Sequence, residues 1–389
     1  MKRIYLDNAA TTYVRSEVMK EMLPYFDKKF GNPGSMHSYG LEAKKVVEES
    51  RNKIAKILNC ESKEVIFTAS GTESINLAIK GFVRANKLKG KHIITSQTEH
   101  HAVLETCKHL ESEGFEITYL KPDKHGVIQP DVLEKEIRKD TILISIMYAN
   151  NEIGTINPIK KLTELVHKHN IIFHTDACQA AGFLDINVKN LGIDLMTVNG
   201  SKIYAPKGIG LLYIRKGIRL NPIIHGGGQE FGLRSGTENI PYIVAIAKAL
   251  ELAQKEKTRE VKRLTKLRDK LVKYLLKISK TFLNGHPKQR LPNNVNITIF
   301  DVEGESVLLM LNEKGICAST GSACTSKNLE PSHVLTSIGL SHGAAHGSLR
   351  FTLGRKTTEN DINKVIKVLP NIVEKLRNIS SVKINETVK

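Results

Sequence analysis

The chain has 389 residues, a length that suits a two-domain enzyme with one extensive core. Its composition, 40% hydrophobic and 25% charged, is typical of soluble globular proteins. The N-terminus turns polar directly after Met1-Lys2-Arg3-Ile4, and no apolar run is long enough to cross a bilayer. We therefore expect a cytoplasmic protein that is neither secreted nor inserted into a membrane.

The charge balance is strongly basic, with 58 Lys and Arg against 40 Asp and Glu, which gives +18. Such an excess is compatible with a nucleic-acid or acidic-protein partner, or with a lysine-rich soluble surface. The second interpretation is favoured because no stretch interleaves basic with aromatic residues and Trp is absent. Direct nucleic-acid binding is not expected.

Five cysteines are scattered along the chain, and no two of them form a CxxC pair. They are Cys60, Cys107, Cys178, Cys317 and Cys324. An odd number without paired spacing speaks against a disulfide framework or a structural zinc site. No metal site is predicted.

Short β-rich apolar runs alternate with helix-period segments through the first two-thirds of the chain. The predicted strands are 65–68, 92–95, 117–120, 142–147, 171–174, 195–198 and 210–214, and the predicted helices between them include 75–86, 102–113 and 159–169. This alternation predicts an α/β fold with a mostly parallel sheet, whose ligand site lies beyond the carboxyl ends of the strands.

From about Leu252 the sequence becomes richer in charged residues, and an amphipathic helix is predicted over 255–280. A strand at 294–300, a helix at 305–313, a Gly/Ser-rich loop and a helix at 359–376 follow. We expect a large domain over 15–255 and a smaller α+β domain over 256–389, with residues 1–14 packing on the smaller one.

A candidate phosphate site follows the first sheet strand, where Val65 to Thr68 leads through Gly71 and Thr72 directly into a helix. Gly71 allows close backbone approach to an anion, and the first amides of the helix and the Thr72 hydroxyl supply donors. The alternative is an ordinary helix N-terminus followed by a glutamate. The segment is neither a Walker A loop nor a GxGxxG motif, so nucleotide binding is not supported.

Two charges stand at predicted strand ends. Asp176 follows the apolar run 171–175, and Lys202 follows the next strand. A buried carboxylate needs a cationic partner, so a structural ion pair is one interpretation. A cofactor explains both charges better, with the carboxylate holding a pyridinium nitrogen and the amine forming a Schiff base with an aldehyde.

Short motifs over essentially the whole chain carry a resemblance to a known family. In chain order they are Tyr5 to Thr12, Gly31 to Pro33, Thr72 to Ser74, Thr98 to His100, Asn150 to Gly154, Asp176 to Gln179, Lys202 to Gly208, His225 to Gly228, Arg234 to Thr237, Gly321 to Cys324 and Leu349 to Phe351. The chain resembles the pyridoxal 5'-phosphate (PLP) cysteine desulfurases of the NifS/IscS type, of the class-V aminotransferase family. This implies fold-type I, a large domain with a mostly parallel seven-stranded sheet flanked by helices plus a smaller α+β domain.

The resemblance also implies roles for residues around PLP. Lys202 would carry the cofactor, Asp176 would bind the pyridine nitrogen, Gln179 would contact the ring hydroxyl, and His100 would lie over the ring and serve in proton transfer. The phosphate contacts would come from Gly71, Thr72, Asn199 and Ser201, with Thr237 reaching in from the partner subunit of a homodimer, and Gly200 would also belong to the cofactor site.

Arg350 would take the substrate carboxylate in a bidentate fork, with Asn151 assisting near cofactor and substrate. Two positions depart from the family pattern. Members usually have His immediately before the Schiff-base lysine and Ser two residues before that, whereas Ser201 and Asn199 stand here. Both can still donate a hydrogen bond to phosphate, but we expect weaker PLP retention.

Cys324 is the predicted nucleophile, because it lies in a stretch of small and polar residues over 318–326 that suits a moving loop. The other four cysteines are interpreted as small buried hydrophobes. The stretch resembles the long-loop class, which hands persulfide directly to partner proteins.

The predicted activity converts L-cysteine to L-alanine and a Cys324 persulfide, whose sulfur passes to an iron-sulfur scaffold protein, to tRNA thiolation or to another acceptor. An aminotransferase or other PLP lyase, a selenocysteine lyase, and a non-catalytic scaffold or RNA-binding protein remain the alternatives.

Overall fold

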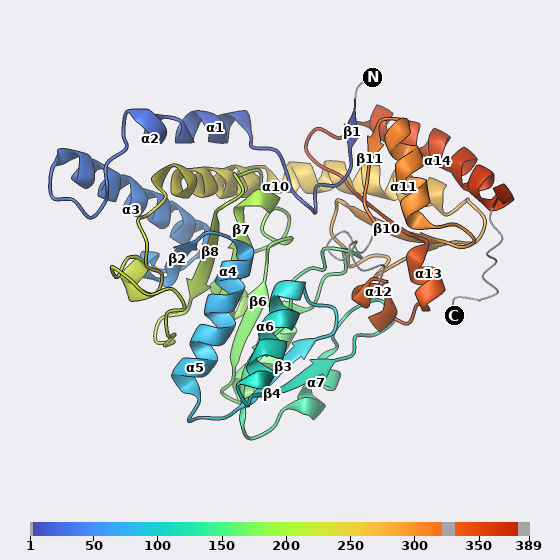
Figure 1. Ribbon diagram of the computed structural model, residues 1–389. Coiled ribbons are helices and arrows are strands. Elements are labelled where there is room, and N and C mark those ends of the chain that lie inside the picture. The colour runs from blue at the N-terminus through green and yellow to red at the C-terminus, as the bar shows by residue number, and fades with distance from the viewer. Residues whose placement is uncertain (1–2, 321–330, 380–389) are drawn as a thin grey trace.

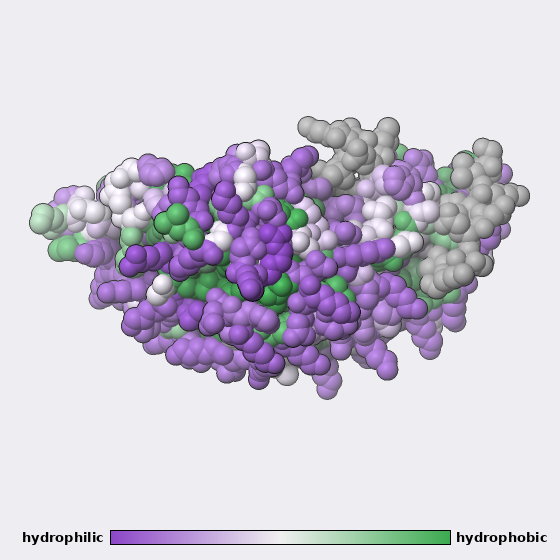
Figure 2. All heavy atoms as spheres, turned by 90° about the horizontal axis from the view of Figure 1, so that it is seen from below, coloured by the Kyte–Doolittle hydropathy of each residue, from purple (hydrophilic) through white to green (hydrophobic). Residues whose placement is uncertain are grey.

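The computed structural model describes residues 3–320 and 331–379. Figure 1 shows a central sheet covered by helices on both faces, with a second, smaller group of strands and helices beside it. Hydrophilic side chains cover most of the face in Figure 2. Within residues 3–320 and 331–379, no helix combines the length and apolar character that a membrane crossing needs.

The central sheet has seven strands in the order β2-β8-β7-β6-β5-β3-β4. Their bounds are β2 Val65–Thr68, β3 His92–Ser96, β4 Glu116–Leu120, β5 Thr141–Ser145, β6 Ile172–Asp176, β7 Leu195–Asn199 and β8 Gly210–Ile214. Neighbouring strands run parallel except β8, which is antiparallel to both β2 and β7. The predicted α/β fold class is confirmed, and the ends of each predicted strand lie within two residues of the observed ones.

Helices cover the two faces of this sheet, so its strands read as apolar runs without alternation. These helices are α4 Gly71–Asn76, α5 Phe82–Asn86, α6 His101–Ser112, α7 Pro130–Glu136, α8 Ile159–Lys168 and α9 Val188–Leu191. A π turn at Leu77–Gly81 joins α4 to α5, so the predicted helix 75–86 in fact begins at Gly71.

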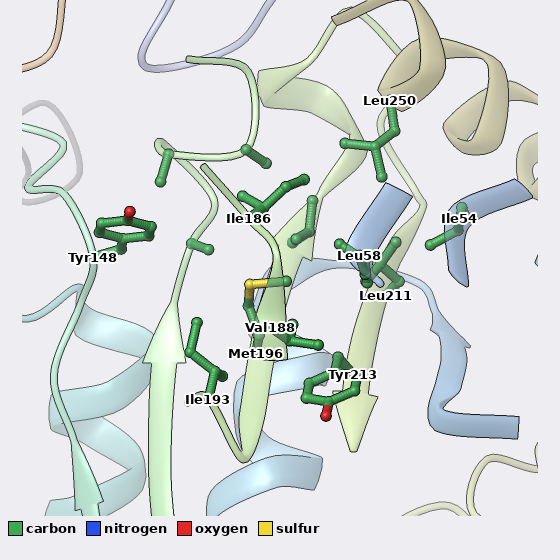
Figure 3. Close-up of a cluster of buried hydrophobic side chains, with 14 of the residues drawn as sticks. Ile54, Leu58, Tyr148, Ile186, Val188, Ile193, Met196, Leu211, Tyr213 and Leu250 are labelled. Carbon is green, nitrogen blue, oxygen red and sulfur yellow. The ribbon is translucent and has the colours of Figure 1, made fainter. Parts of the chain in front are cut away.

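Three N-terminal helices were not predicted, namely α1 Ser16–Met22, α2 Pro24–Asp27 and α3 Ser38–Leu58. Helix α3 packs on one face of the sheet, where Ile54 and Leu58 are fully buried. Figure 3 shows both side chains in a cluster with Leu211 of β8 and Leu250. Burying each of them stabilises the fold by roughly 2 kcal/mol.

Helix α10 spans Ile240–Leu275, so the prediction that this helix begins near 255 is wrong. Its first turns carry the nearly uninterrupted apolar run 243–250, which is buried against the large core. A helix that is buried on every side lacks the amphipathic spacing on which the prediction relied. The Asn239 side chain caps its start by accepting from the Tyr242 amide.

The second group of strands forms the three-stranded sheet β12-β10-β9, with antiparallel neighbours, at β9 Thr281–Leu283, β10 Asn294–Ile299 and β12 Ser348–Thr352. The short strands β1 Ile4–Tyr5 and β11 Ile316–Cys317 pair in parallel. The helices here are α11 Gly304–Glu313, α12 His333–Ser337, α13 His342–His346 and α14 Glu359–Ile379.

A separate cluster of buried side chains holds this smaller part together and includes Leu6, Leu271 and Phe351. Helix α10 contributes to both clusters, with Ile246 and Leu250 in the larger and Leu264 to Leu275 in the smaller. The domain division at 255 and 256 stays a proposal, which the separation of these clusters supports.

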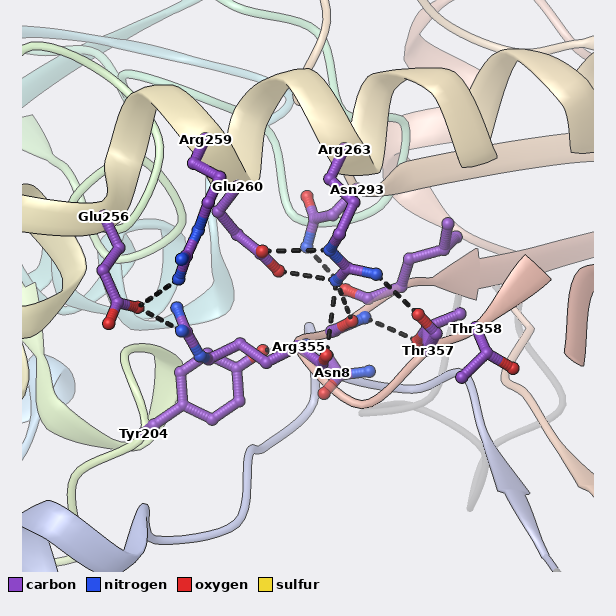
Figure 4. Close-up of polar contacts among 12 residues, drawn as sticks. Asn8, Tyr204, Glu256, Arg259, Glu260, Arg263, Asn293, Arg355, Thr357 and Thr358 are labelled. Atoms are coloured by element: carbon purple, nitrogen blue, oxygen red, sulfur yellow. Dashed lines mark hydrogen bonds and ion pairs between the residues drawn. The ribbon is translucent and has the colours of Figure 1, made fainter.

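Polar contacts in the middle of α10 join the two parts, as Figure 4 shows. Glu256 binds Arg355, and Arg15 donates to the same carboxylate at 3.0 Å. Arg263 donates to Glu260 and to the carbonyl oxygens of residues 354 and 357. The chain that follows β12 is thereby fixed to the helix.

Candidate active site

A cavity of about 330 Å³ lies at the carboxyl ends of the central strands. Nine of the predicted site residues line it, namely Gly71, Thr72, His100, Asn151, Asp176, Gln179, Asn199, Lys202 and Arg350. Ala9, Ala10, Ile75, Met147, Ala149 and Cys178 complete the wall. Segments far apart in the sequence therefore meet where an α/β sheet places its ligands.

The parallel strands explain this convergence. Asp176 is the last residue of β6 and Asn199 the last of the adjacent β7, so both side chains stand at the same edge of the sheet. Lys202 ends the single 3-10 turn Gly200–Lys202 that follows β7, and its Nζ donates to the carbonyl oxygen of Ala10 at 2.5 Å. The lysine thus reaches toward the N-terminal segment across the cavity.

The turn between β2 and α4 forms a cradle. The Ser70 side chain caps the helix by accepting from the Glu73 amide at 3.1 Å. A Cβ on Gly71 would lie 2.9 Å from Cys178 Sγ and 3.3 Å from Asn199 Cβ. Only glycine therefore leaves this corner of the cavity open, as an anion contacting the first helical amides requires.

Asn199 and Ser201, the two departures from the family pattern, bind each other. Asn199 Oδ1 accepts from the Ser201 amide at 3.1 Å and from its hydroxyl at 3.2 Å. Asn199 lines the cavity, whereas Gly200 and Ser201 are buried behind it. The predicted phosphate contact of the Ser201 hydroxyl therefore competes with its bond to Asn199.

Asp176 is buried, and its Oδ1 accepts from the Cys178 amide at 2.9 Å. Gln179 donates from Nε2 to the carbonyl oxygen of Ala9 at 3.0 Å, which leaves its side-chain oxygen for a ligand. Both bonds fix the turn after β6 and hold the two side chains at the cavity wall.

His100 is the N-cap residue of α6, and its Nδ1 accepts from the Ala102 amide at 3.0 Å. A neutral ring that accepts at Nδ1 carries its proton on Nε2. Burial lowers the pKa of His100, so the neutral ring is favoured. The ring of the neighbouring His101 packs against that of His333, with ring centroids 4.7 Å apart and the ring planes tilted by 59°.

Arg350 is 3% exposed and lines the cavity. Its Nη2 donates to Asp7 Oδ1 at 3.0 Å and its Nη1 to the Asn151 carbonyl oxygen at 3.2 Å. Its Nε has no hydrogen-bond partner within residues 3–320 and 331–379. A buried guanidinium with an unused donor suits a carboxylate ligand.

Two buried carboxyl groups near the cavity were missed by the sequence analysis. Burial raises the pKa of Glu152 to about 7, and this carboxyl accepts from the Ser332 hydroxyl. Glu99 accepts from the Met147 amide at 2.7 Å, and burial raises its pKa well above the usual value. The signal in the sequence was that both lie inside motifs that carry the family resemblance, Thr98 to His100 and Asn150 to Gly154.

Thr237 and Cys324 are the remaining predicted site residues. Thr237 is exposed and does not line the cavity. Cys324 lies outside the described residues. On the N-terminal side of residues 321–330, the Ser319 amide donates to the Arg350 carbonyl oxygen at 3.1 Å. On the C-terminal side of residues 321–330, His333 Nε2 contacts the Glu99 carbonyl oxygen at 2.9 Å.

Of the four cysteines interpreted as small buried hydrophobes, Cys107 is fully buried, whereas Cys60, Cys178 and Cys317 are half-buried. Cys178 also lines the cavity. Within residues 3–320 and 331–379, no three His, Cys, Asp or Glu side chains are grouped to hold a metal ion.

Comparison with known proteins places this geometry in a family. Residues 4–365 match the model of the aminotransferase class-V family. The chain is 56% identical to the cysteine desulfurase IscS of Methanosarcina thermophila over 97% of this chain and 94% of the relative. The chain belongs to the class-V aminotransferases, among the cysteine desulfurases of the NifS/IscS type.

Other members of the family agree. Identity to the IscS of Dictyoglomus turgidum is 54%, with 98% of each chain covered. A solved NifS-like protein superposes with a TM-score of 0.91 at 38% identity, covering 96% of this chain and all of that one. A solved structure of SspA in complex with cysteine has a TM-score of 0.79 at 37% identity, covering 90% and 98% of the two chains. Enzymes of this family depend on PLP in general.

Proposed function

We propose that this protein is a PLP-dependent cysteine desulfurase, which takes sulfur from L-cysteine, releases L-alanine and holds the sulfur on Cys324. The observation that carries the proposal is the convergence of Lys202, Asp176, His100 and Arg350 on one cavity. The similar SspA, solved in complex with cysteine, supports the choice of substrate.

The cavity fits PLP in its donor set. The Gly71 corner and the first turn of α4 suit a phosphate, Asp176 suits a pyridine nitrogen, and the Lys202 amine suits an aldehyde. When bound, PLP supplies a sink for the electron pair released at the substrate Cα. Asp176 would keep the ring nitrogen protonated because a buried carboxylate favours a neighbouring positive charge.

The substrate would be oriented by Arg350. Its guanidinium would bind the carboxylate of L-cysteine, and Asn151 lies beside it at the cavity wall. This arrangement would direct the Cα proton toward the Lys202 amine, which takes it up, while the neutral His100 is available for proton transfer. Both groups line the same cavity, so the proton need not cross solvent.

Sulfur transfer is assigned to Cys324. Its thiolate would attack the sulfur of the substrate, forming a sulfur–sulfur bond, while the electron pair of the broken carbon–sulfur bond stays with carbon, which is then protonated to the methyl group of alanine. Of the residues described on either side of 321–330, Ser319 binds the backbone of Arg350, and His333 binds the backbone of Glu99, the neighbour of His100.

Incubation of the purified protein with L-cysteine tests the proposal. We expect alanine to accumulate and the Cys324 peptide to gain one sulfur atom in mass spectrometry. Cys324→Ala should lose alanine and sulfide production but keep the PLP absorbance, while the matched Cys317→Ala should behave as wild type. An aminotransferase would be indifferent to both changes. A chain that stays colourless with added PLP contradicts the proposal.

We also propose a homodimer. Exposed apolar side chains gather between α1 and α2, on α2, on the loop that follows and at the start of α3, and they are Leu23, Phe26, Phe30, Met36, Tyr39 and Leu41. A gathering of exposed apolar side chains of this kind is typical of a protein interface. Phe30→Glu with Met36→Glu should shift sedimentation from dimer to monomer, whereas Leu88→Glu, at an exposed position away from these helices, should not.

The proposed dimer would let Thr237 complete the partner's phosphate site. The acceptor of the sulfur is proposed to be an iron-sulfur scaffold protein or a tRNA-thiolation protein. The cytoplasmic location stays a prediction, which cell fractionation tests.

A further inference from the structure

Segment 226–239 is bound to the cradle by an ion pair. Arg234 Nε donates to Glu73 Oε1 at 2.8 Å, while Glu73 Oε2 accepts from the Ala69 amide at 2.9 Å. The side chains are 23% and 13% exposed. One carboxylate therefore connects the turn that opens the cofactor site to a segment about 160 residues away.

A second ion pair holds the same segment to α3, and a backbone bond holds it to β2. Arg51 donates from Nη1 and Nη2 to the two carboxylate oxygens of Glu230, both at 2.8 Å. Glu230 Oε2 also accepts from the Phe67 amide at 2.8 Å. The two side chains are only 4% and 3% exposed, so loss of either partner leaves a buried charge without compensation.

The backbone at this point is unfavourable without these contacts. Glu230 and Phe231 have φ angles of 49° and 58°, so two successive non-glycine residues are left-handed. Side chains seldom adopt this conformation unless their surroundings impose it. The Arg51 guanidinium lies over the Phe231 ring at 5.0 Å, which adds a further restraint.

We propose that Glu73 and Glu230 are positioning residues. Through Arg234 and Arg51 they fix segment 226–239 on α3, β2 and α4 of their own chain, so that Thr237 is presented outward in one conformation. This inference rests on the proposed homodimer, because Thr237 acts in the partner's cofactor site. Each cradle then sets the geometry of the neighbouring site as well as its own.

Amide hydrogen exchange of the full-length holoenzyme tests the local part of the proposal. Arg234→Met and Glu230→Gln should lower protection of amides 230–236 by at least about tenfold. Arg84→Met is the matched control, since Arg84 forms an exposed ion pair with Glu113 on other helices. Unchanged protection in Arg234→Met, which is the less buried of the two positions, overturns the proposal. This measurement stands even if the chain proves monomeric or inactive.

Hybrid dimers test the effect on the partner. In the first hybrid, one chain carries both Arg234→Met and Lys202→Ala, and the other chain is wild type. The intact Lys202 then lies in the wild-type chain, whose cofactor site receives Thr237 from the altered chain. In the second hybrid, one chain carries Arg234→Met and the other carries Lys202→Ala. The intact Lys202 then lies in a site that receives Thr237 from a chain whose segment 226–239 is unaltered. We expect PLP release from the working site to be about tenfold faster in the first hybrid than in the second. Equal rates, or the reverse order, overturn the proposal. Absence of PLP binding or of dimers in the wild type would instead contradict the proposed function.

Discussion

Asp7 and Arg350 are 343 residues apart and bound side chain to side chain, with Nη2 donating to Oδ1 at 3.0 Å. Asp7 follows the short strand β1, and Arg350 lies in the middle of β12. The N-terminal segment thereby supplies the countercharge for the group assigned to the substrate carboxylate. The pairing also explains how a guanidinium that is 3% exposed is tolerated when no ligand is bound.

Asp7→Asn should destabilise the protein, because Arg350 would keep its buried charge and lose its anionic partner. We expect the free energy of unfolding to fall by about 2 kcal/mol. Urea denaturation measures this, with Glu113→Gln as the control at an exposed ion pair. A difference between the two variants of less than about 0.5 kcal/mol would contradict the assigned pairing.

Arg350→Lys keeps the charge but removes the planar fork. We expect the KM for L-cysteine to rise at least about tenfold, while kcat changes less, because the carboxylate is held both before and during reaction. Steady-state measurement of alanine production gives both constants. An unchanged KM would remove Arg350 from the substrate site.

Gly71→Ala should weaken PLP binding, because the new methyl group would lie 2.9 Å from Cys178 Sγ. We expect PLP to dissociate about tenfold faster, as followed by absorbance. Cys178→Ala in the same chain removes the sulfur atom and should restore much of the affinity. If the double variant is no better than Gly71→Ala, the contact with Cys178 is not what keeps this corner open.

His174 should make stability fall in acid. It is fully buried, its Nδ1 contacts the Ser145 hydroxyl at 2.8 Å, and burial lowers its pKa to about 4. Below its ordinary value of about 6.5, the unfolded chain takes up a proton that the native chain does not. The contribution of neutral His174 to the free energy of unfolding is therefore complete above a pH of about 6.5. It is lost as pH falls toward 4, by about 3 kcal/mol in total.

The check is urea denaturation between pH 7 and pH 4.5, compared between His174→Gln and wild type. The variant should lose less stability over this range than wild type does. His342→Gln, at an exposed position, should follow the wild-type profile. Parallel profiles for wild type and His174→Gln would show that this ring is not the source.

Restoring the family pattern with Asn199→Ser and Ser201→His should strengthen PLP retention. The present side chains bind each other at 3.2 Å, so part of their hydrogen-bonding capacity is used inside the turn. We expect PLP dissociation to slow by about threefold to tenfold. Equal dissociation rates would mean that the native pair serves the phosphate as well as the usual one.

The sequence was sufficient for features with a local signal. The apolar runs predicted the strands. The charged residues Asp176 and Lys202 after two of these runs predicted a shared site, because parallel strands bring their carboxyl ends together. The start of α10 was missed because a fully buried helical stretch has no polar face. Asp7 and Cys178 were missed for a different reason, since their importance arises only when remote segments fold against the cavity.

Helix α10 is 36 residues long, so it extends about 54 Å as a single rod. Its first half is embedded in one cluster of buried side chains and its last turns in the other. Neither half of the molecule can melt without exposing part of this shared rod. Heating should consequently give a single calorimetric peak, even though the architecture suggests two folding units.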